Sequence, residues 1–284
     1  MSAGICVMNK NAVAMAADSA VTVGNHSAVY NSVDKLFQLS NVAPVGLLFY
    51  GRAELMGAPL EIIVSEYKKY LGNKTFSSLN QYVDDFCEYI EQNSQYFMFE
   101  KYEKEYIYYF CNGFLREIKR RFSDYIEQCQ NSEKPSYDLV INGLNKIFMD
   151  YLNDFDKYEK LETSFAEYAR DKYSDFLKSE IIDNENIDFL NTNQKKILCE
   201  KVFTLLDTKF SFGDTGIAIA GYGEKEIYPH LCNFSLDAVL NGKIRLISKN
   251  ECEISDSPSA IISPFAQRDI IDNILTGIIQ NITF

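Results

Sequence analysis

The first fifty residues of the chain have the pattern of short strands. Two mostly apolar runs, Ala3–Asn9 and Ala12–Ala17, are joined by a polar turn at Lys10 and Asn11. Short apolar runs separated by a polar turn are typical of a β-hairpin. Further short apolar runs at 29–32, 35–39 and 45–50 predict more strands, with turn residues between them. The N-terminal part of the chain is therefore predicted to be β-structure.

Residues 52–212 have a different pattern. Apolar residues recur there at three- and four-residue steps, as in the series Tyr102, Tyr106, Phe110, Phe114 and Ile118. This spacing places apolar side chains on one face of an amphipathic helix. Breaks in the pattern fall near residues 73–74, 131–135, 154–156 and 183–186. We expect about five or six helices in this region.

Strands are predicted again after residue 212. Residues 216–221 are apolar, and the runs 227–239 and 243–248 flank Asn241-Gly242, a strong signal for a tight hairpin turn. Residues 264–279 again carry apolar side chains at helical spacing. We expect a helix there, with Ser263 as its N-cap and Pro264 as its first residue.

Composition and charge restrict the partners of the protein. The chain has 284 residues, of which 46% are hydrophobic, so it can bury a sizeable core. Its formal net charge of −12 argues against nucleic acid or an acidic membrane surface as a partner, because both attract basic proteins. No apolar run approaches the roughly 20 residues that span a bilayer, and no signal peptide is recognisable.

The cysteines and histidines narrow the chemistry further. The 7 cysteines are an odd number and include no CxxC pair, so we expect reduced, mostly buried thiols and a cytoplasmic location. The only histidines are His26 and His230, which argues against a His-rich metal site and against a Ser-His-Asp triad.

Two blocks of the sequence resemble a known family. Residues 2–51 resemble the start of proteasome β-subunits and their bacterial relatives, which are N-terminal-nucleophile hydrolases. The resemblance rests on Ala16-Ala17-Asp18-Ser19, Thr22, Gly24-Asn25, Val33-Asp34-Lys35-Leu36-Phe37-Gln38-Leu39, Gly46 and Gly51, and it resumes at Ile217-Ala218-Ile219-Ala220-Gly221-Tyr222-Gly223. It implies an α+β fold, a four-layer αββα sandwich formed by residues 1–284 as a single domain. The helical stretch between the blocks implies an insertion at approximately 73–210.

The resemblance also implies a site. Removal of Met1 would leave Ser2 as the N-terminal residue, whose hydroxyl is the nucleophile and whose α-amine is the base. An α-amine has an ordinary pKa near 7.7–8.0, and the ammonium of Lys35 would lower it further. Asp18 resembles the carboxylate that pairs with this lysine. Gly51 resembles the donor of the oxyanion-binding amide, with Tyr50 as the alternative register, and Thr22 resembles a threonine that lines the substrate groove.

Three functions are compatible with these residues. The first is hydrolysis of amide bonds, in peptides above all, through a Ser2 acyl-enzyme, and the second is a non-peptidase acylase of the same chemistry. The third is a catalytically silent scaffold or binding subunit. The intact set of Ser2, Asp18 and Lys35 argues against the third, and the lack of a counterpart to the family's last strands argues for it. Ala20 in place of the family's common arginine is a further departure from the family.

The resemblance implies partners but no metal or organic cofactor. The substrate would be a peptide or a small amide. Relatives assemble into rings or stacks, so we expect a homo-oligomer, and the helical insertion is a candidate surface for an unfoldase or another protein partner.

Overall fold

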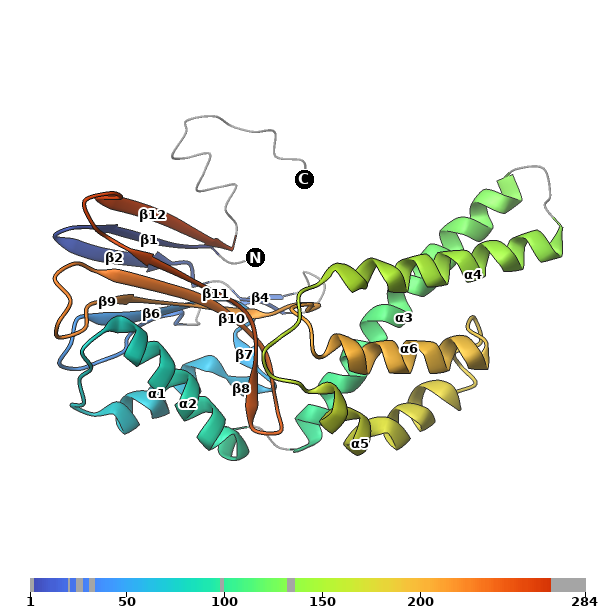
Figure 1. The fold of residues 1–284 in the computed structure, drawn as a ribbon, viewed down its shortest axis with the longest axis horizontal. Coiled ribbons are helices and arrows are strands. Elements are labelled where there is room, and N and C mark those ends of the chain that lie inside the picture. Colours follow the sequence, from blue (N-terminus) through green and yellow to red (C-terminus); the bar gives the residue numbers. More distant parts are fainter. Residues whose placement is uncertain are drawn as a thin grey trace. The chain divides into compact units, whose positions relative to one another are not determined.

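The computed structural model describes residues 3–19, 21–23, 28–30, 34–97, 100–131 and 136–266. It is a mixed α and β structure with antiparallel sheets (Figure 1). The chain divides into two compact units. The first contains residues 1–99 and 213–284, and the second contains residues 100–212.

The first unit contains two larger sheets. One has the strand order β12-β1-β2, and the other has the order β11-β10-β9-β6-β5. Two-stranded pairs are formed by β3 with β4 and by β7 with β8. The strands are β1 (Ala3–Asn9), β2 (Ala12–Ala17), β3 (Val21–Val23), β4 (Ala28–Tyr30), β5 (Leu36–Gln38), β6 (Val45–Gly51), β7 (Glu54–Leu55), β8 (Ala58–Pro59), β9 (Thr215–Gly221), β10 (His230–Leu240), β11 (Lys243–Glu253) and β12 (Ala260–Ala266).

The two larger sheets pack against each other through alternate residues of their strands. Along β1, Cys6 and Met8 are buried and Val7 between them is exposed. The buried residues join a cluster with Leu48 of β6 and Phe265 of β12. Because side chains alternate between the faces of a strand, one run of sequence builds both the interior and the outer face of the sheet.

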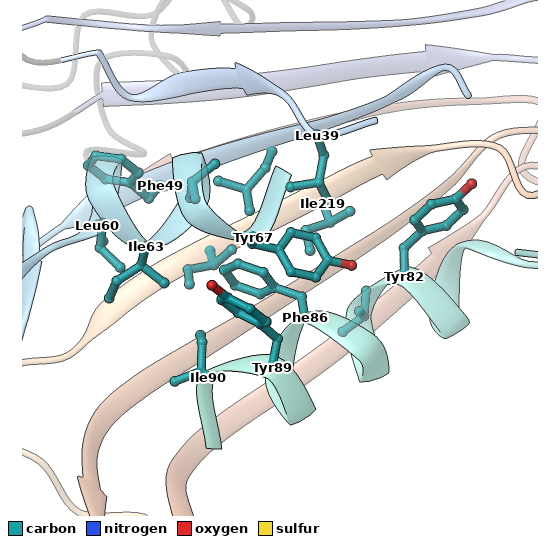
Figure 2. Packing of buried hydrophobic residues seen from close by; sticks show 14 of the residues in the cluster. Leu39, Phe49, Leu60, Ile63, Tyr67, Tyr82, Phe86, Tyr89, Ile90 and Ile219 are labelled. Atoms are coloured by element: carbon teal, nitrogen blue, oxygen red, sulfur yellow. The ribbon is translucent and has the colours of Figure 1, made fainter. Parts of the chain in front are cut away.

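Two helices cover the other face of the five-stranded sheet (Figure 2). They are α1 (Leu60–Leu71) and α2 (Leu79–Phe97). Tyr67 of α1 packs edge-on against Phe86 of α2, in a cluster that includes Phe49 and Ile219 of the sheet. The first unit is therefore layered as sheet, sheet and helix pair within the described residues.

The predicted strands are confirmed, with small shifts at their ends. The hairpin of β1 and β2 pairs Asn9 with Ala12, and the hairpin of β10 and β11 turns at Asn241 and Gly242. Both residues of that turn have positive φ, 51° and 69°, which matches the twist of the flanking strands. The short strands β3, β7 and β8 were not predicted, and residues 31 and 32 of the predicted strand 29–32 lie outside the described residues.

The predicted helix at 264–279 is wrong at its beginning. Pro264 lies inside β12, opposite Ile5 of β1, and Ser263 is opposite Cys6. Proline lacks the N–H that a central strand must donate, but β12 lies at the edge of its sheet, with β1 as its neighbour. Residues 267–279 lie outside the described residues.

The second unit is helical and has an aromatic core. Its elements are α3 (Glu100–Asn131), α4 (Tyr137–Asn153), η1 (Asp154–Lys157), α5 (Ala166–Leu177), η2 (Lys178–Ile182) and α6 (Thr192–Leu205). Phe114 of α3 packs edge-on against Phe155 and Phe212, with ring centroids 5.0 and 4.8 Å away. Within the described residues, no helix of the chain has the length and apolar character needed to cross a membrane.

The cysteines of both units are free thiols. Cys6, Cys111, Cys199 and Cys232 are buried, and the other three are partly buried, as the sequence predicted. Burial raises the pKa of the Cys6 thiol to about 12, with a smaller contribution from Cys252.

Candidate active site at the start of β1

The hairpin of β1 and β2 positions the first candidate residue. Asp18 directly follows β2, and its backbone N–H donates to the carbonyl oxygen of Ala3 over 3.0 Å. The N–H of Ala3 donates in return to Oδ1 of Asp18, also over 3.0 Å. The carboxylate is therefore fixed at the start of β1, one residue along the chain from Ser2.

Lys35 approaches the same carboxylate from the other sheet. It directly precedes β5, and its carbonyl oxygen accepts a hydrogen bond of 2.9 Å from the N–H of Phe49 in β6. Its Nζ donates to Oδ1 of Asp18 over 2.9 Å. One oxygen atom of Asp18 therefore accepts hydrogen bonds from the buried ammonium and from the backbone of β1.

The burial of this ion pair is uneven. The side chain of Lys35 is 2% exposed, whereas that of Asp18 is 30% exposed. Lysine is almost never fully buried unless it is paired, because removing an ammonium from water is costly. A lysine that only decorates a strand would instead extend its amine into solvent.

Gly51 ends β6 in a conformation that suits glycine. Its φ is +80°, and a Cβ at this position would lie 2.8 Å from the carbonyl oxygen of Asp214. The alternative register concerns the backbone amide of Tyr50, and its side chain makes separate contacts. Its hydroxyl donates to Oδ1 of Asn233 over 2.8 Å, and its ring stacks on Phe265 with centroids 5.4 Å apart.

The remaining predicted residues are only partly placed. Ser2 lies outside the described residues. Thr22 lies in β3 opposite Val29, and its side chain is outside the described part. The structure thus brings together Asp18, Lys35 and the start of β1.

A cavity of about 410 Å³ lies beside this site and was not predicted. Its lining includes Tyr50, Leu231, Asn233, Asn250, Ser263 and Phe265. The sequence does carry a signal for it. Asn233 and Ser235 interrupt the apolar run of β10 from Leu231 to Leu236, and polar side chains in a largely buried strand need partners for their hydrogen bonds.

A buried ion pair in the same sheet was also missed. Arg245 of β11 is fully buried and forms a salt bridge with Asp237 of β10, whose side chain is almost as inaccessible. The register of β10 against β11 shifts between Leu236 and Ala238, so Asp237 lies at a bulge.

Comparisons with known proteins leave the family open. No protein-family model, curated protein or solved structure matches this chain. The resemblance to proteasome β-subunits therefore stays a prediction, and the functional argument depends on the geometry of the site.

Proposed function

We propose that this protein is an N-terminal-nucleophile hydrolase that cleaves amide bonds, most often in peptides, through an acyl-enzyme on Ser2. The observation that carries the proposal is the shared oxygen of Asp18, which accepts from the buried Lys35 ammonium and from the N–H of Ala3. This arrangement fixes a positive charge close to the residue that follows Ser2 in the chain. Burying a lysine ammonium costs free energy because the charge leaves water, and a positive charge at this place can shift the pKa of a catalytic group.

The proposed reaction begins after loss of Met1. The α-amine of Ser2 accepts the proton of its own hydroxyl, and the oxygen attacks the carbonyl carbon of the substrate. The Lys35 ammonium keeps the pKa of the amine low enough for it to act as a base at neutral pH. The amide N–H of Gly51 donates to the oxyanion.

Collapse of the oxyanion forms the acyl-enzyme, and hydrolysis of its ester completes the cycle. The C–N bond breaks, and the leaving amine takes the proton from the α-ammonium of Ser2. A water molecule then attacks the ester carbonyl and gives a proton to the α-amine. The bond between the acyl carbon and Oγ of Ser2 then breaks, and Oγ takes the proton back from the α-ammonium. The carboxylic acid is released, and the Ser2 hydroxyl and free α-amine are restored.

The proposal includes the fold and assembly that the resemblance implies. The two facing sheets and the layer of α1 and α2 are compatible with three layers of an αββα sandwich. We also propose that the protein acts in the cytoplasm as a homo-oligomer. The second unit is then a candidate surface for a protein partner.

Hydrolysis of fluorogenic peptide amides tests the proposal. We expect Ser2→Ala to abolish turnover, Ser2→Thr to retain part of it, and Lys35→Met to reduce it by about 100-fold or more. The matched control is Lys69→Met, because Lys69 pairs with Glu66 on the exposed face of α1. Turnover that survives Ser2→Ala would contradict the proposal. Hydrolysis of simple acyl amides without cleavage of peptides would select the acylase, and no Ser2-dependent hydrolysis of either would select the silent scaffold.

A further inference from the structure

The unpredicted cavity lies along the β12 edge of the three-stranded sheet, next to the start of β1. Its wall includes residues 263–266 of β12, and Ala266 is opposite Ala3 in the ladder of β12 and β1. Asp18 flanks Ala3 on the other side. The first described residue of β1 therefore separates the ion pair from the cavity.

The opposite wall of the cavity is formed by the five-stranded sheet. Asn233 of β10 and Asn250 of β11 are opposite each other in register, and Leu231 is opposite Cys252. Tyr50 of β6 closes the wall between the sheets, where its ring stacks on Phe265. A site with walls from two packed sheets is preformed by the fold rather than by one loop.

The polar groups in this wall are uncharged and partly unused. The hydroxyl of Tyr50 occupies Oδ1 of Asn233, so the amide nitrogen of Asn233 is left as a donor. Within the part of the chain that the structure describes, Asn250 and Ser263 make no side-chain hydrogen bond. No carboxylate, ammonium or guanidinium group is among the described residues that line the cavity.

This chemistry selects for a neutral ligand with amide groups. Amide nitrogens, amide oxygens and a hydroxyl can pair with a carboxamide or a peptide unit, and the stacked rings of Tyr50 and Phe265 offer an apolar surface. A charged side chain would lose its water without gaining a partner of opposite charge. The volume is within the range of sites for small ligands, about 300–1,000 Å³.

We propose that this cavity is a specificity site for an uncharged, amide-bearing segment of a peptide, and that it rejects acidic and basic side chains. The inference rests on the proposed function in one respect, namely that the bound segment adjoins the bond attacked by Ser2. Asn233 and Ser263 are the specificity-determining residues.

Calorimetric titration of the Ser2→Ala protein tests binding without cleavage. The probes are acetyl-Ala-Gln-Ala-amide, the same peptide with Glu in the middle, which is a near-isostere of Gln, and the same peptide with Lys in the middle. We expect the Gln peptide to bind at least ten-fold more tightly than the other two. Asn233→Leu and Ser263→Val should each weaken Gln binding at least five-fold, while Asn73→Leu, an exposed loop asparagine, should not. Melting temperatures of the variants show which of them are folded.

Protection of Cys252 from alkylation locates the bound peptide. Cys252 lines the cavity and is partly buried, so a bound Gln peptide should slow its reaction with N-ethylmaleimide several-fold. Mass spectrometry separates it from Cys129, which lies in the second unit and serves as the internal control.

The outcomes separate the two proposals. Equal affinity for the three peptides, no binding of the Gln peptide at millimolar concentration, or binding unaffected by Asn233→Leu would overturn the specificity site. Selective binding in a protein that has no Ser2-dependent hydrolysis would support the site and contradict the hydrolase. Ser2-dependent hydrolysis without selective binding would do the reverse.

Discussion

Removing Asp18 should lower the free energy of unfolding more than replacing Lys35 does, because the two side chains of this ion pair are buried to different extents. Lys35 is 2% exposed and Asp18 is 30% exposed. Asp18→Ala leaves the ammonium buried without this carboxylate. Lys35→Met leaves a carboxylate that still reaches water and the N–H of Ala3, and it fills the buried space with an apolar chain of similar length.

The magnitudes follow from this asymmetry. Loss of one partner that strands a buried charge costs about 3–5 kcal/mol, whereas apolar replacement of a buried charge is often close to neutral. We expect about 3 kcal/mol of destabilisation for Asp18→Ala and less than about 1 kcal/mol for Lys35→Met. At about 2–4 °C per kcal/mol for a unit of this size, the melting temperature should fall by about 6–12 °C in Asp18→Ala and by less than about 4 °C in Lys35→Met.

Thermal melts followed by circular dichroism measure this difference. Glu66→Ala is the control, because it removes the carboxylate of an exposed ion pair with Lys69 and should cost less than about 1 kcal/mol. The reasoning is refuted if Asp18→Ala melts like Glu66→Ala, or if Lys35→Met is as unstable as Asp18→Ala. Either result would mean that the ammonium does not depend on this carboxylate.

Three further predictions concern stability. The Arg120 guanidinium, and after it that of Arg121, lowers the pKa of Glu117 to about 2, so its contribution is complete above the ordinary pKa of 4.5 and is lost as the pH falls toward 2. The difference in melting temperature between wild type and Glu117→Gln should therefore shrink between about pH 6 and about pH 3, and a constant difference would exclude the ion pair as its source. Gly51→Ala should lower the free energy of unfolding by about 1–2 kcal/mol in chemical denaturation and should also lower hydrolysis, because φ of Gly51 is positive and a Cβ would crowd a backbone carbonyl. The control Gly46→Ala, on the same strand, places its Cβ at ordinary contact distances and should cost less. Asp237→Ala should lower the free energy of unfolding by about 3–5 kcal/mol, because it leaves Arg245 buried without this partner. Glu159→Ala, which removes one partner of an exposed ion pair, should lower it by less than about 1 kcal/mol. Similar values for the two variants would contradict the burial of the Asp237–Arg245 pair.

The strands were predictable where local signals and tertiary packing agree. The hairpin of β1 and β2 follows from two apolar runs with a polar turn between them. The turn at Asn241-Gly242 is specific, because both residues tolerate the positive φ that it requires. In α6, the predicted helix is reinforced by a capping box between Asn191 and Gln194.

The segment at Pro264 shows where local signals fail. Serine followed by proline at the start of an apolar periodic run is typical of a helix N-terminus. From Ala260 to Ala266, hydrogen bonding to β1 in an antiparallel ladder outweighs this helix signal. A short helix without tertiary contacts is only marginally stable in water, whereas the strand gains a partner for its backbone groups. A pairing partner more than 250 residues away in sequence cannot be read from a local window.

The candidate site was predictable in part, and for a different reason. Neither Asp18 nor Lys35 has a local pattern that separates it from a turn or surface residue, and the resemblance alone pointed to their contact. Asn233 and Arg245 were missed because a polar residue in a strand is ordinarily assigned to the exposed face. The full burial of Arg245 and the half-buried position of Asn233 between the sheets become visible only once both sheets are in place.

Intact-protein mass spectrometry after treatment with a β-lactone tests the central claim most directly. A β-lactone acylates an activated N-terminal serine and leaves ordinary serines unmodified. We predict that wild type lacks Met1 and gains a single adduct, that Ser2→Ala gains none, and that Lys35→Met gains it at least ten-fold more slowly. Retained Met1, or an adduct that persists in Ser2→Ala, would contradict an N-terminal nucleophile at the start of β1.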